Sequence, residues 1–433
     1  MQWWVALEIL DTILKTGRGL ADEVEVYLVE GRSVSAELKR EVVSKSIESH
    51  HFGLSIRSVM DGCIGISSTS NPANWKKCLE ASLASVKLAT PQVWKGMPEP
   101  MPITGTHLSF DPSLKPEPAT IRKILLSMLD GASRHLVSVT SGGATISLDT
   151  ITLANSHGIH YSRQKSQVSA SLETIRETST GYEFNSSCSL DFDPAAIGDR
   201  AGFLAAESIN GKDIGTGNYN VILSPLAFAQ LLSAVLVPAL SGRNVHAGRS
   251  RLADSLGLSI TDHSISISDE PLRKGGLGST RWDAEGTPTR QLPFIRDGVL
   301  ESFAYDLKTA YRYGVKSTGS AVRSGAGGLP AIGHHNLVIE GESSNLMDEP
   351  ALLVQDVVGA HTANPLSGDF SVELTNPFMV SGGTYEFPVR KAMMSGNVFD
   401  MLREIAGLGN DQRIIGSMLI PSIKLKKQQI IGI

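Results

Sequence analysis

The first half of this 433-residue chain contains several segments in which apolar residues occupy every second position. The clearest runs are Glu23-Val-Glu-Val-Tyr-Leu-Val29, Val34-Ser-Ala-Glu-Leu38 and Gly53-Leu-Ser-Ile-Arg-Ser-Val59, and Asp61-Gly62 leads from the last run into Cys63-Ile-Gly-Ile66. A period of two is typical of strands with one buried face, and Asp-Gly between two such runs is a hairpin signal. The pattern therefore predicts an antiparallel meander.

Helices are predicted in groups that stand apart from the strands. Apolar residues at helical spacing and helix-start signals predict helices over 3–16, 73–88, 120–135, 194–209, 224–240 and 397–406. Alternation returns between 144 and 180, and short strands separated by glycine-rich connections fill most of the second half. We therefore predict an α+β fold of antiparallel sheets with packed helices, and not a doubly wound sheet.

The length exceeds what one average core accommodates, so we expect two domains. Gly211, Gly215 and Gly217 follow the last helix of the first half and mark a change towards longer, glycine-rich loops. We place the boundary there, which gives an N-terminal α+β domain over 1–215 and a C-terminal β-rich domain over 216–433.

Composition disfavours several classes of function. The net charge is −5, and no basic run exceeds Lys424-Leu-Lys-Lys427, so direct nucleic-acid binding is not expected. The N-terminal helix carries Glu8 and Asp11 and lacks a basic leader, and no apolar stretch reaches about 20 residues. The three cysteines include no CxxC pair, which disfavours a thiolate zinc site. We expect a cytoplasmic protein without a membrane span.

A polar loop late in the second half is the first candidate site. The segment Gly359-Ala-His-Thr-Ala-Asn-Pro-Leu-Ser-Gly-Asp-Phe-Ser371 places His361, Asn364, Ser367 and Asp369 between two strand-like runs. Serine, histidine and aspartate nominally supply a nucleophile, a base and an orienting group. The same residue types also cap turns. A third interpretation, which we adopt, makes the loop the polar wall of a groove for an extended peptide.

Two further polar clusters lie in the second half. Arg281, Asp283 and Glu285 alternate along an apparent strand, which suits an exposed row of ion pairs better than a substrate contact. Ser317-Thr-Gly-Ser320 with Arg323 could bind a peptide carboxylate, because arginine offers a planar fork of donors. The candidate substrate-binding residues of these clusters are Arg281, Ser317, Thr318 and Arg323.

Other patterns that invite a cofactor are weaker. His157 and His160 are three apart on a predicted hairpin, and His334 and His335 are adjacent, so the side chains of each pair diverge and no metal is assigned to them. The glycine stretches at 275–278 and 325–328 lack the Lys-Ser/Thr of a phosphate-binding loop.

Short motifs run in a fixed order through both halves. They are Ala21-Asp-Glu-Val-Glu-Val-Tyr27, Gly53-Leu-Ser-Ile-Arg57, Asn155-Ser-His-Gly158, Val221-Ile-Leu-Ser-Pro225, Ser279-Thr-Arg-Trp-Asp-Ala-Glu-Gly-Thr-Pro-Thr289, Ile295-Arg-Asp-Gly-Val-Leu300, Ser317-Thr-Gly-Ser-Ala-Val-Arg323, the His361 loop and Met394-Ser-Gly-Asn397. In this order they resemble the TldD/PmbA family, and more closely its PmbA (TldE) branch. The resemblance covers nearly the whole chain.

The resemblance also exposes a departure. Members resembling TldD are zinc peptidases in which an HExxxH helix holds the metal. None of the eleven histidines here is followed by glutamate, so that motif is absent from the sequence. The resemblance places it on the helix after Ser224-Pro225, where Ser233, Ala234 and Pro238 fall at the ligand and base positions. The C-terminal domain would then carry a degenerate peptidase site.

What the resemblance implies is a non-metal subunit of a TldD-type metallopeptidase complex that processes or degrades small or unfolded peptides. No cofactor is expected in this chain, and zinc is expected in the TldD-like partner. This chain would supply part of the substrate groove, an interface and one wall of an enclosed chamber.

The alternative is a homodimeric, non-catalytic protein that binds peptides or regulates other proteins. Members of the family have been described as modulators of DNA gyrase, and the negative net charge favours action through protein partners. A metal-free hydrolase built on His361 ranks third.

Overall fold

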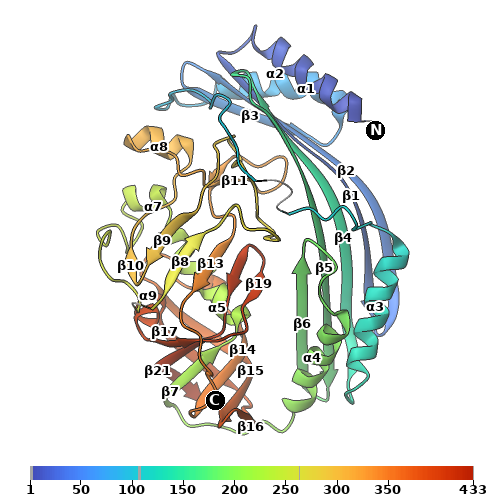
Figure 1. Cartoon of the computed structure of the whole chain (residues 1–433), viewed down its shortest axis with the longest axis vertical. Coiled ribbons are helices and arrows are strands. Elements are labelled where there is room, and N and C mark those ends of the chain that lie inside the picture. Colours follow the sequence, from blue (N-terminus) through green and yellow to red (C-terminus); the bar gives the residue numbers. More distant parts are fainter. Residues whose placement is uncertain (1–2, 106–108, 263, 433) are drawn as a thin grey trace.

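The N-terminal half of the chain folds around one long, curved sheet (Figure 1). The computed structural model describes residues 3–105, 109–262 and 264–432. All pairings in this sheet are antiparallel, in the order β3-β2-β1-β4-β5-β6. The strands are β1 (Glu23–Lys39), β2 (Val42–Met60), β3 (Cys63–Thr69), β4 (Ser138–Asn155), β5 (His160–Arg176) and β6 (Ser179–Ser187).

Four helices cover one face of this sheet. They are α1 (Trp3–Gly17), α2 (Trp75–Val86), which follows the 3₁₀ turn η1 (Pro72–Asn74), α3 (Pro118–Ala132) and α4 (Pro194–Glu207). The side chains of β1 that pack beneath the helices are Val24, Val26, Leu28, Val34, Ala36 and Leu38, all even-numbered. Tyr27 and Val29 point to the opposite face. The period-two pattern therefore predicted the meander correctly, because successive side chains of a strand alternate between faces.

The second half is centred on the apolar helix that begins at Ser224. The Ser224 hydroxyl accepts a hydrogen bond from the N–H of Ala227, as expected of an N-cap before a first-turn proline. The helix consists of α5 (Pro225–Leu231), a π-helical turn η2 (Leu232–Leu236) and α6 (Val237–Ala239). Its side chains Phe228, Leu231 and Val235 are fully buried in the largest hydrophobic core.

Two main sheets surround this helix. One has the order β14-β7-β21-β17-β15-β16, with β18 paired to β21, and the other has the order β10-β9-β8-β13-β20-β19. The strands are β7 (Gly217–Leu223), β8 (Ser266–Asp269), β9 (Leu292–Arg296), β10 (Val299–Leu300), β11 (Ala321–Val322), β12 (Ala331–Ile332), β13 (Leu337–Glu340), β14 (Ala351–Val358), β15 (Asp369–Ser381), β16 (Thr384–Pro388), β17 (Ala392–Asn397), β18 (Ile405–Leu408), β19 (Arg413–Ile415), β20 (Met418–Ile420) and β21 (Ile423–Gly432).

Short helical segments connect these strands. They are α7 (Gly242–His246), α8 (Leu307–Tyr313), the 3₁₀ turn η3 (Ala360–Thr362) and α9 (Val398–Arg403). The α+β prediction is confirmed, with one difference in detail: β7 pairs with β14, and β13 with β20, in parallel. Each of these pairs joins strands distant in sequence, which local alternation cannot orient.

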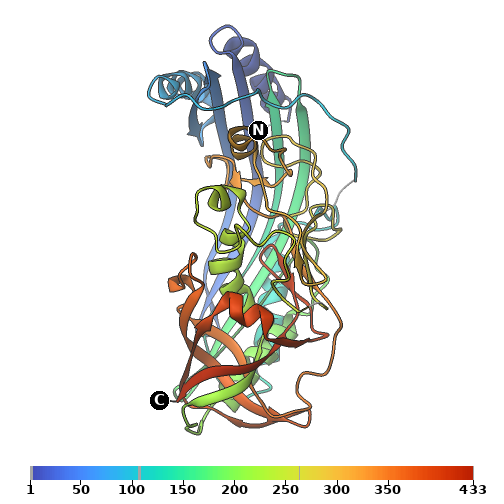
Figure 2. The ribbon, with the colours of Figure 1, turned by 90° about the vertical axis from the view of Figure 1, so that its left-hand side faces the viewer.

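The C-terminal half lies along the face of the long sheet that the four helices leave uncovered. Figure 1 shows the sheet curving past it, and Figure 2, turned by 90°, shows the C-terminal half in front of the long sheet. Tyr27, Ile151 and Leu153 of the sheet pack against Trp282 of the C-terminal half. Both faces of the long sheet are therefore covered in this region. Among the described helices, none is long and apolar enough to cross a membrane.

The contact between α3 and α4 depends on two glycines. A Cβ atom at Gly198 would lie 1.8 Å from the carbonyl oxygen of Met128, and one at Gly131 would lie 2.0 Å from that of Ala195. We expect Gly198→Ala to destabilise the protein, because overpacking costs about 1–3 kcal/mol and outweighs the gain of about 1 kcal/mol in helix propensity. The midpoint of denaturant unfolding measures this effect.

Gly215→Ala is the matched control, since a Cβ there would meet no atom within 4 Å. A Gly198→Ala protein as stable as the Gly215→Ala protein would contradict the close approach of the two helices.

Candidate functional site

The π-helical turn lies where the resemblance places the degenerate peptidase motif. The N–H of Val237 donates to the carbonyl oxygen of Leu232, a bond between residues five apart. Such a turn brings positions five apart onto one side of a helix, which the spacing between the two histidines of HExxxH requires. Ser233 and Pro238 have this spacing, with Ser233 exposed and Pro238 half-buried. The chain therefore has the backbone geometry of an i, i+5 ligand pair without the ligands.

These residues do not fit zinc. Ser233 offers one hydroxyl, whose oxygen lies 3.8 Å from the sulfur of Met418, and the methyl group of Ala234 and the ring of Pro238 offer no donor atom. Zinc in proteins is held by thiolates, imidazoles and carboxylates. In the described part of the chain, no group of three or more such side chains is placed to hold a metal ion.

Next to this helix face, Gln230 and Asp356 form a partly buried pair. The amide of Gln230 on α5 donates to Oδ1 of Asp356 on β14 at 2.5 Å. Burial raises the pKa of Asp356 to about 6. Burial raises the pKa of the Tyr182 hydroxyl on β6, and Asp356 is one of the nearby negative charges that add to the shift.

The His361 loop is organised by its own polar residues. The Ser367 hydroxyl donates to Asp369 at 2.7 Å, and the Asn397 amide donates to the other oxygen of Asp369 at 2.8 Å. These two bonds lower the pKa of Asp369. Asn364 accepts from the two N–H groups of the following turn. His361 is exposed on η3 and makes no hydrogen bond within the described ranges. The turn-capping contacts are thus formed, and a Ser-His bond is not.

The hydroxyls of Ser317 and Thr318 are also engaged. Both donate to the carbonyl oxygen of Tyr305, and Thr318 accepts from the N–H of Tyr305 at 2.8 Å. Arg281 donates to the carbonyl oxygen of Gly105 at 3.2 Å and lies over the ring of Trp282. The hydrogen bonds of Ser317, Thr318 and Arg281 hold neighbouring loops in place. That these residues bind a substrate stays a prediction.

The interpretation of Asp283 and Glu285 as an exposed row was wrong, since each is only 1% exposed. The segment is a tight turn, in which the carboxylate of Asp283 accepts the N–H groups of Glu285, Thr287 and Ala321. Period-two spacing here reflects this turn, because the side chain of an aspartate readily folds back onto backbone N–H groups two residues on.

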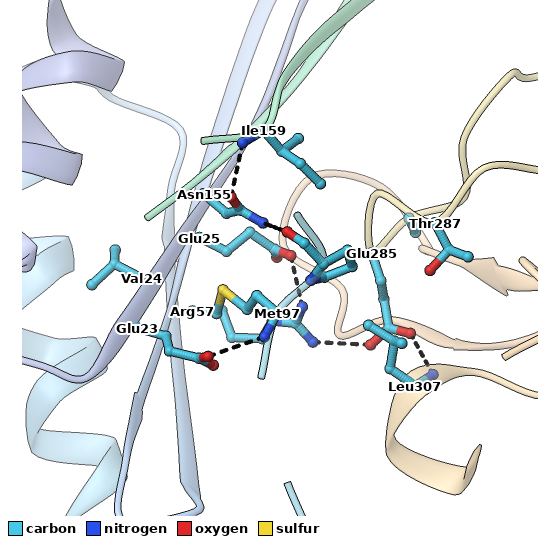
Figure 3. Close-up of polar contacts among 12 residues, drawn as sticks. Glu23, Val24, Glu25, Arg57, Met97, Asn155, Ile159, Glu285, Thr287 and Leu307 are labelled. Atoms are coloured by element: carbon cyan, nitrogen blue, oxygen red, sulfur yellow. Dashed lines mark hydrogen bonds and ion pairs between the residues drawn. The ribbon is translucent and has the colours of Figure 1, made fainter. Parts of the chain in front are cut away.

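Glu285 begins a buried chain of four alternating charges that joins the two halves. Arg57 of β2 donates to Glu285 at 3.1 Å and to Glu25 of β1 at 2.6 Å (Figure 3). Arg323, from the C-terminal half, donates to the other oxygen of Glu25. All four side chains are at most 4% exposed. Arg323, which the sequence suggested as a carboxylate ligand, therefore already has a carboxylate partner within the chain.

Burial changes the pKa values of this cluster. Burial alone would lower the pKa of Arg57, but the negative charges of Glu25 and Glu285 outweigh this effect and raise the pKa above its ordinary value. Burial also raises the pKa of Glu285, although Arg57 opposes the shift, and Leu307 donates its N–H to that carboxylate at 2.8 Å (Figure 3). Burial and the charge of Glu285 raise the pKa of Asp283 to about 8.

Two cavities lie between the long sheet and the C-terminal half. The first, of about 310 Å³, is lined on the sheet by Tyr27, Asp149, Arg163 and Lys165, and opposite by the loops around Gly278, Arg323, His334 and Ser417. The second, of about 400 Å³, is lined by Glu183, Arg200, Ser224, Gln355, Tyr385 and Arg413 among others. Sequence reasoning missed both cavities; the available signal was Arg163 and Lys165 at alternate positions of one strand.

Small hydroxyl side chains cover the same face of the sheet beyond the first cavity. Register places Ser33 beside Ser147, Ser35 beside Thr145, and Thr145 beside Ser169. Being odd-numbered, these residues share the face of Tyr27, which is turned towards the C-terminal half. All are half-buried, and we call them the hydroxyl face: Ser33, Ser35, Thr145, Ser147, Ser169 and Ser171.

Comparison with known proteins is consistent along the whole chain. Three family profiles match it, described as PmbA/TldA metallopeptidase domain 1 over 24–86, central domain over 111–209 and C-terminal domain over 216–432. An uncharacterized protein of Methanocaldococcus jannaschii is 32% identical, covering 97% of this chain and 99% of its own length. A metalloprotease PmbA homolog of Haemophilus influenzae is 27% identical, covering 97% and 94%.

Solved structures agree. TldE from Thermococcus kodakarensis matches with a TM-score of 0.92 and 25% identity over 98% of this chain and 100% of its own. A candidate modulator of a DNA gyrase from Thermotoga maritima matches with a TM-score of 0.88 and 25% identity over 98% and 99%. The fold is that of a metallopeptidase-like protein, and the chain belongs to the PmbA/TldD family. Within the family it falls in the PmbA/TldE branch.

We expect Arg57→Met to destabilise the protein strongly. It leaves Glu25 with one partner and Glu285 without its arginine, and removing one member of a buried ion pair costs about 3–5 kcal/mol. Arg32→Met is the control, because its bond to Glu48 is solvent-exposed and such pairs contribute about 0–1 kcal/mol. Denaturant unfolding of both variants measures the difference; equal losses would contradict a structural role for the buried chain.

Because the pKa of Asp283 is raised in the folded state, we expect the stability of the protein to depend on pH. This pKa of about 8 in the folded state lies above the ordinary value of 3.8, so the folded chain binds more protons between these limits. Stability should therefore fall as pH rises from 5 to 8, by up to about 1.4 kcal/mol per pH unit from this group. The slope should be shallower in Asp283→Asn and unchanged in the exposed control Asp254→Asn. An unchanged slope in Asp283→Asn would refute the raised pKa.

Proposed function

We propose that this chain is the non-metal subunit of a TldD-type metallopeptidase complex that processes or degrades small or unfolded peptides in the cytoplasm. The observation that carries the proposal is the π-helical turn. Its backbone aligns positions five apart, and the resemblance puts Ser233, Ala234 and Pro238 at the positions of two ligands and a base. The likeness to a TldE structure over nearly the full length supports it.

In such a complex the zinc and the water-activating base come from a TldD-like partner. The residues of this chain bind and orient peptide. The hydroxyl face offers donors and acceptors at every second residue of neighbouring strands, a spacing that suits an extended backbone. The exposed His361 loop, which is bonded to Arg251 and Asn397, is a separate candidate for a polar wall that contacts peptide. The two cavities are candidates for holding chain ends or side chains.

The second candidate is a homodimeric regulatory protein that binds peptide without any catalysis. The likeness to a candidate modulator of a DNA gyrase favours it. With a net charge of −5, such regulation would act through a protein partner and not through DNA.

Co-expression with a TldD-like protein tests the choice. We expect a heteromeric complex in which zinc and cleavage of an unstructured peptide depend on the partner, with faster cleavage than by the partner alone. This chain purified alone should contain no stoichiometric zinc and cleave nothing. Zinc-dependent cleavage by this chain alone would refute the proposal, and peptide binding without any complex would favour the regulatory protein.

The triple variant Ser233→His, Ala234→Glu, Pro238→His tests whether the π-helical turn aligns positions 233 and 238 for metal binding. Because the π-helical turn already aligns positions 233 and 238, the variant should bind zinc more tightly than the unsubstituted chain. Elemental analysis after dialysis measures zinc per chain.

A further inference from the structure

We propose that the cavity lined by Arg163 and Lys165 is a binding site for the C-terminal carboxylate of a peptide. The inference builds on the proposed role in peptide handling and assigns the chemical group that this wall of the complex recognises.

The site is a partly open cavity between two walls. On the sheet, Asp149 of β4 pairs with Lys165 of β5, and Ile151 pairs with Arg163 two register positions away, on the same face. The opposite wall comes from the loop at Gly278 and from His334, whose ring lies 3.0 Å from the hydroxyl of Ser417. The volume of about 310 Å³ is at the lower end for ligand sites and fits a chain terminus better than a long segment.

Lys165 is a cation without a partner in this space. Within the described ranges its ammonium group makes no hydrogen bond and no ion pair. The neighbouring Asp149 is engaged by His51 at 2.8 Å. Burial, aided by the charge of Arg163, lowers the pKa of Lys165 although Asp149 opposes the shift, so the charge of Lys165 is costly. An anion entering the cavity would remove that cost.

Arg163 adds a second cation. One of its N–H groups donates to the carbonyl oxygen of Ser279 at 2.9 Å, which fixes the guanidinium and leaves other donors free. The third arginine of the cavity, Arg323, is neutralised by Glu25. Burial and the neighbouring Glu285 raise the pKa of Asp283, which disfavours a negative charge on its carboxyl group. The cavity therefore carries an excess of positive charge, which suits a carboxylate held by a planar fork.

The residues that follow Lys165 on the same strand favour a peptide as the molecule that carries the carboxylate. Lys165 is followed on its face by Gln167, Ser169 and Ser171, each half-buried. Alternate residues of a strand are about 6.7 Å apart, which is also the two-residue repeat of an extended peptide. A peptide whose end lies at Lys165 would therefore meet a polar side chain at each repeat.

The test compares one short, acetylated, unstructured peptide of Gly, Ser and Leu with a free C-terminal carboxylate and with a C-terminal amide. Calorimetry on the chain, and on its complex with the TldD-like partner, gives both affinities. For the native protein we expect the acid to bind about 10- to 100-fold more tightly than the amide, the usual range for a hydrogen bond to a charged group. Lys165→Met should abolish this preference, and Lys165→Arg should keep most of it.

Lys45→Met, which removes an exposed lysine outside the cavity, is the control and should keep the full preference. Equal binding of acid and amide by the native protein, loss of both affinities by the same factor in Lys165→Met, or no binding of either peptide to chain or complex would overturn the inference. Competition by inorganic phosphate as strong as that by the peptide acid would show a site for small anions and would also overturn it.

The two proposals fail separately. An active, zinc-containing complex without preference for the carboxylate would remove only the carboxylate site. Carboxylate-dependent binding by a chain that forms no complex would remove only the subunit role.

Discussion

The buried chain of alternating charges from Glu285 through Arg57 and Glu25 to Arg323 sets how the two halves of the molecule meet. Taking charges out of water is expensive, and the cost is recovered only when each charge meets its counterpart at bonding distance. Hydrophobic contacts such as those around Trp282 hold the halves together but tolerate small displacements. The four buried charges do not tolerate such displacements, so they fix the distance between the two walls of the first cavity. We regard these charges as a device for geometry more than for stability.

Much of the fold could be read from the sequence, because local patterns report local structure. Alternation identified the meander, the Ser224-Pro225 pair identified the start of the central helix, and the order of the motifs identified the family. The helix near the C-terminus is shorter than predicted, since β18 begins at Ile405. The π-helical turn was not foreseen, because an apolar run has the same appearance in an α-helix and in a π-helix.

The candidate site was harder to predict because its parts are far apart in the sequence. Alternation of apolar and polar residues shows which face of a strand packs on a core, but it does not show that the polar face is also buried. Polar residues such as Glu25 and Arg57 therefore look solvent-exposed in the sequence although they are buried. Arg323 could not be matched to Glu25, almost 300 residues away, from one sequence. The His361 loop was located correctly as a polar turn, yet only coordinates show Ser367 and Asp369 bonded to each other.

The strand order of the largest C-terminal sheet has a consequence for how the chain is made. β21, over residues 423–432, lies between β7 and β17, in the interior of the sheet, although it is synthesised after both. Until it emerges from the ribosome, β7 lacks one neighbour and the core around the central helix stays open. Such pairing between distant segments slows folding. The long N-terminal sheet, complete by residue 187, can form before the second half is synthesised. The C-terminal sheet cannot be completed until residues 423–432 are available, and it needs protection from aggregation until then.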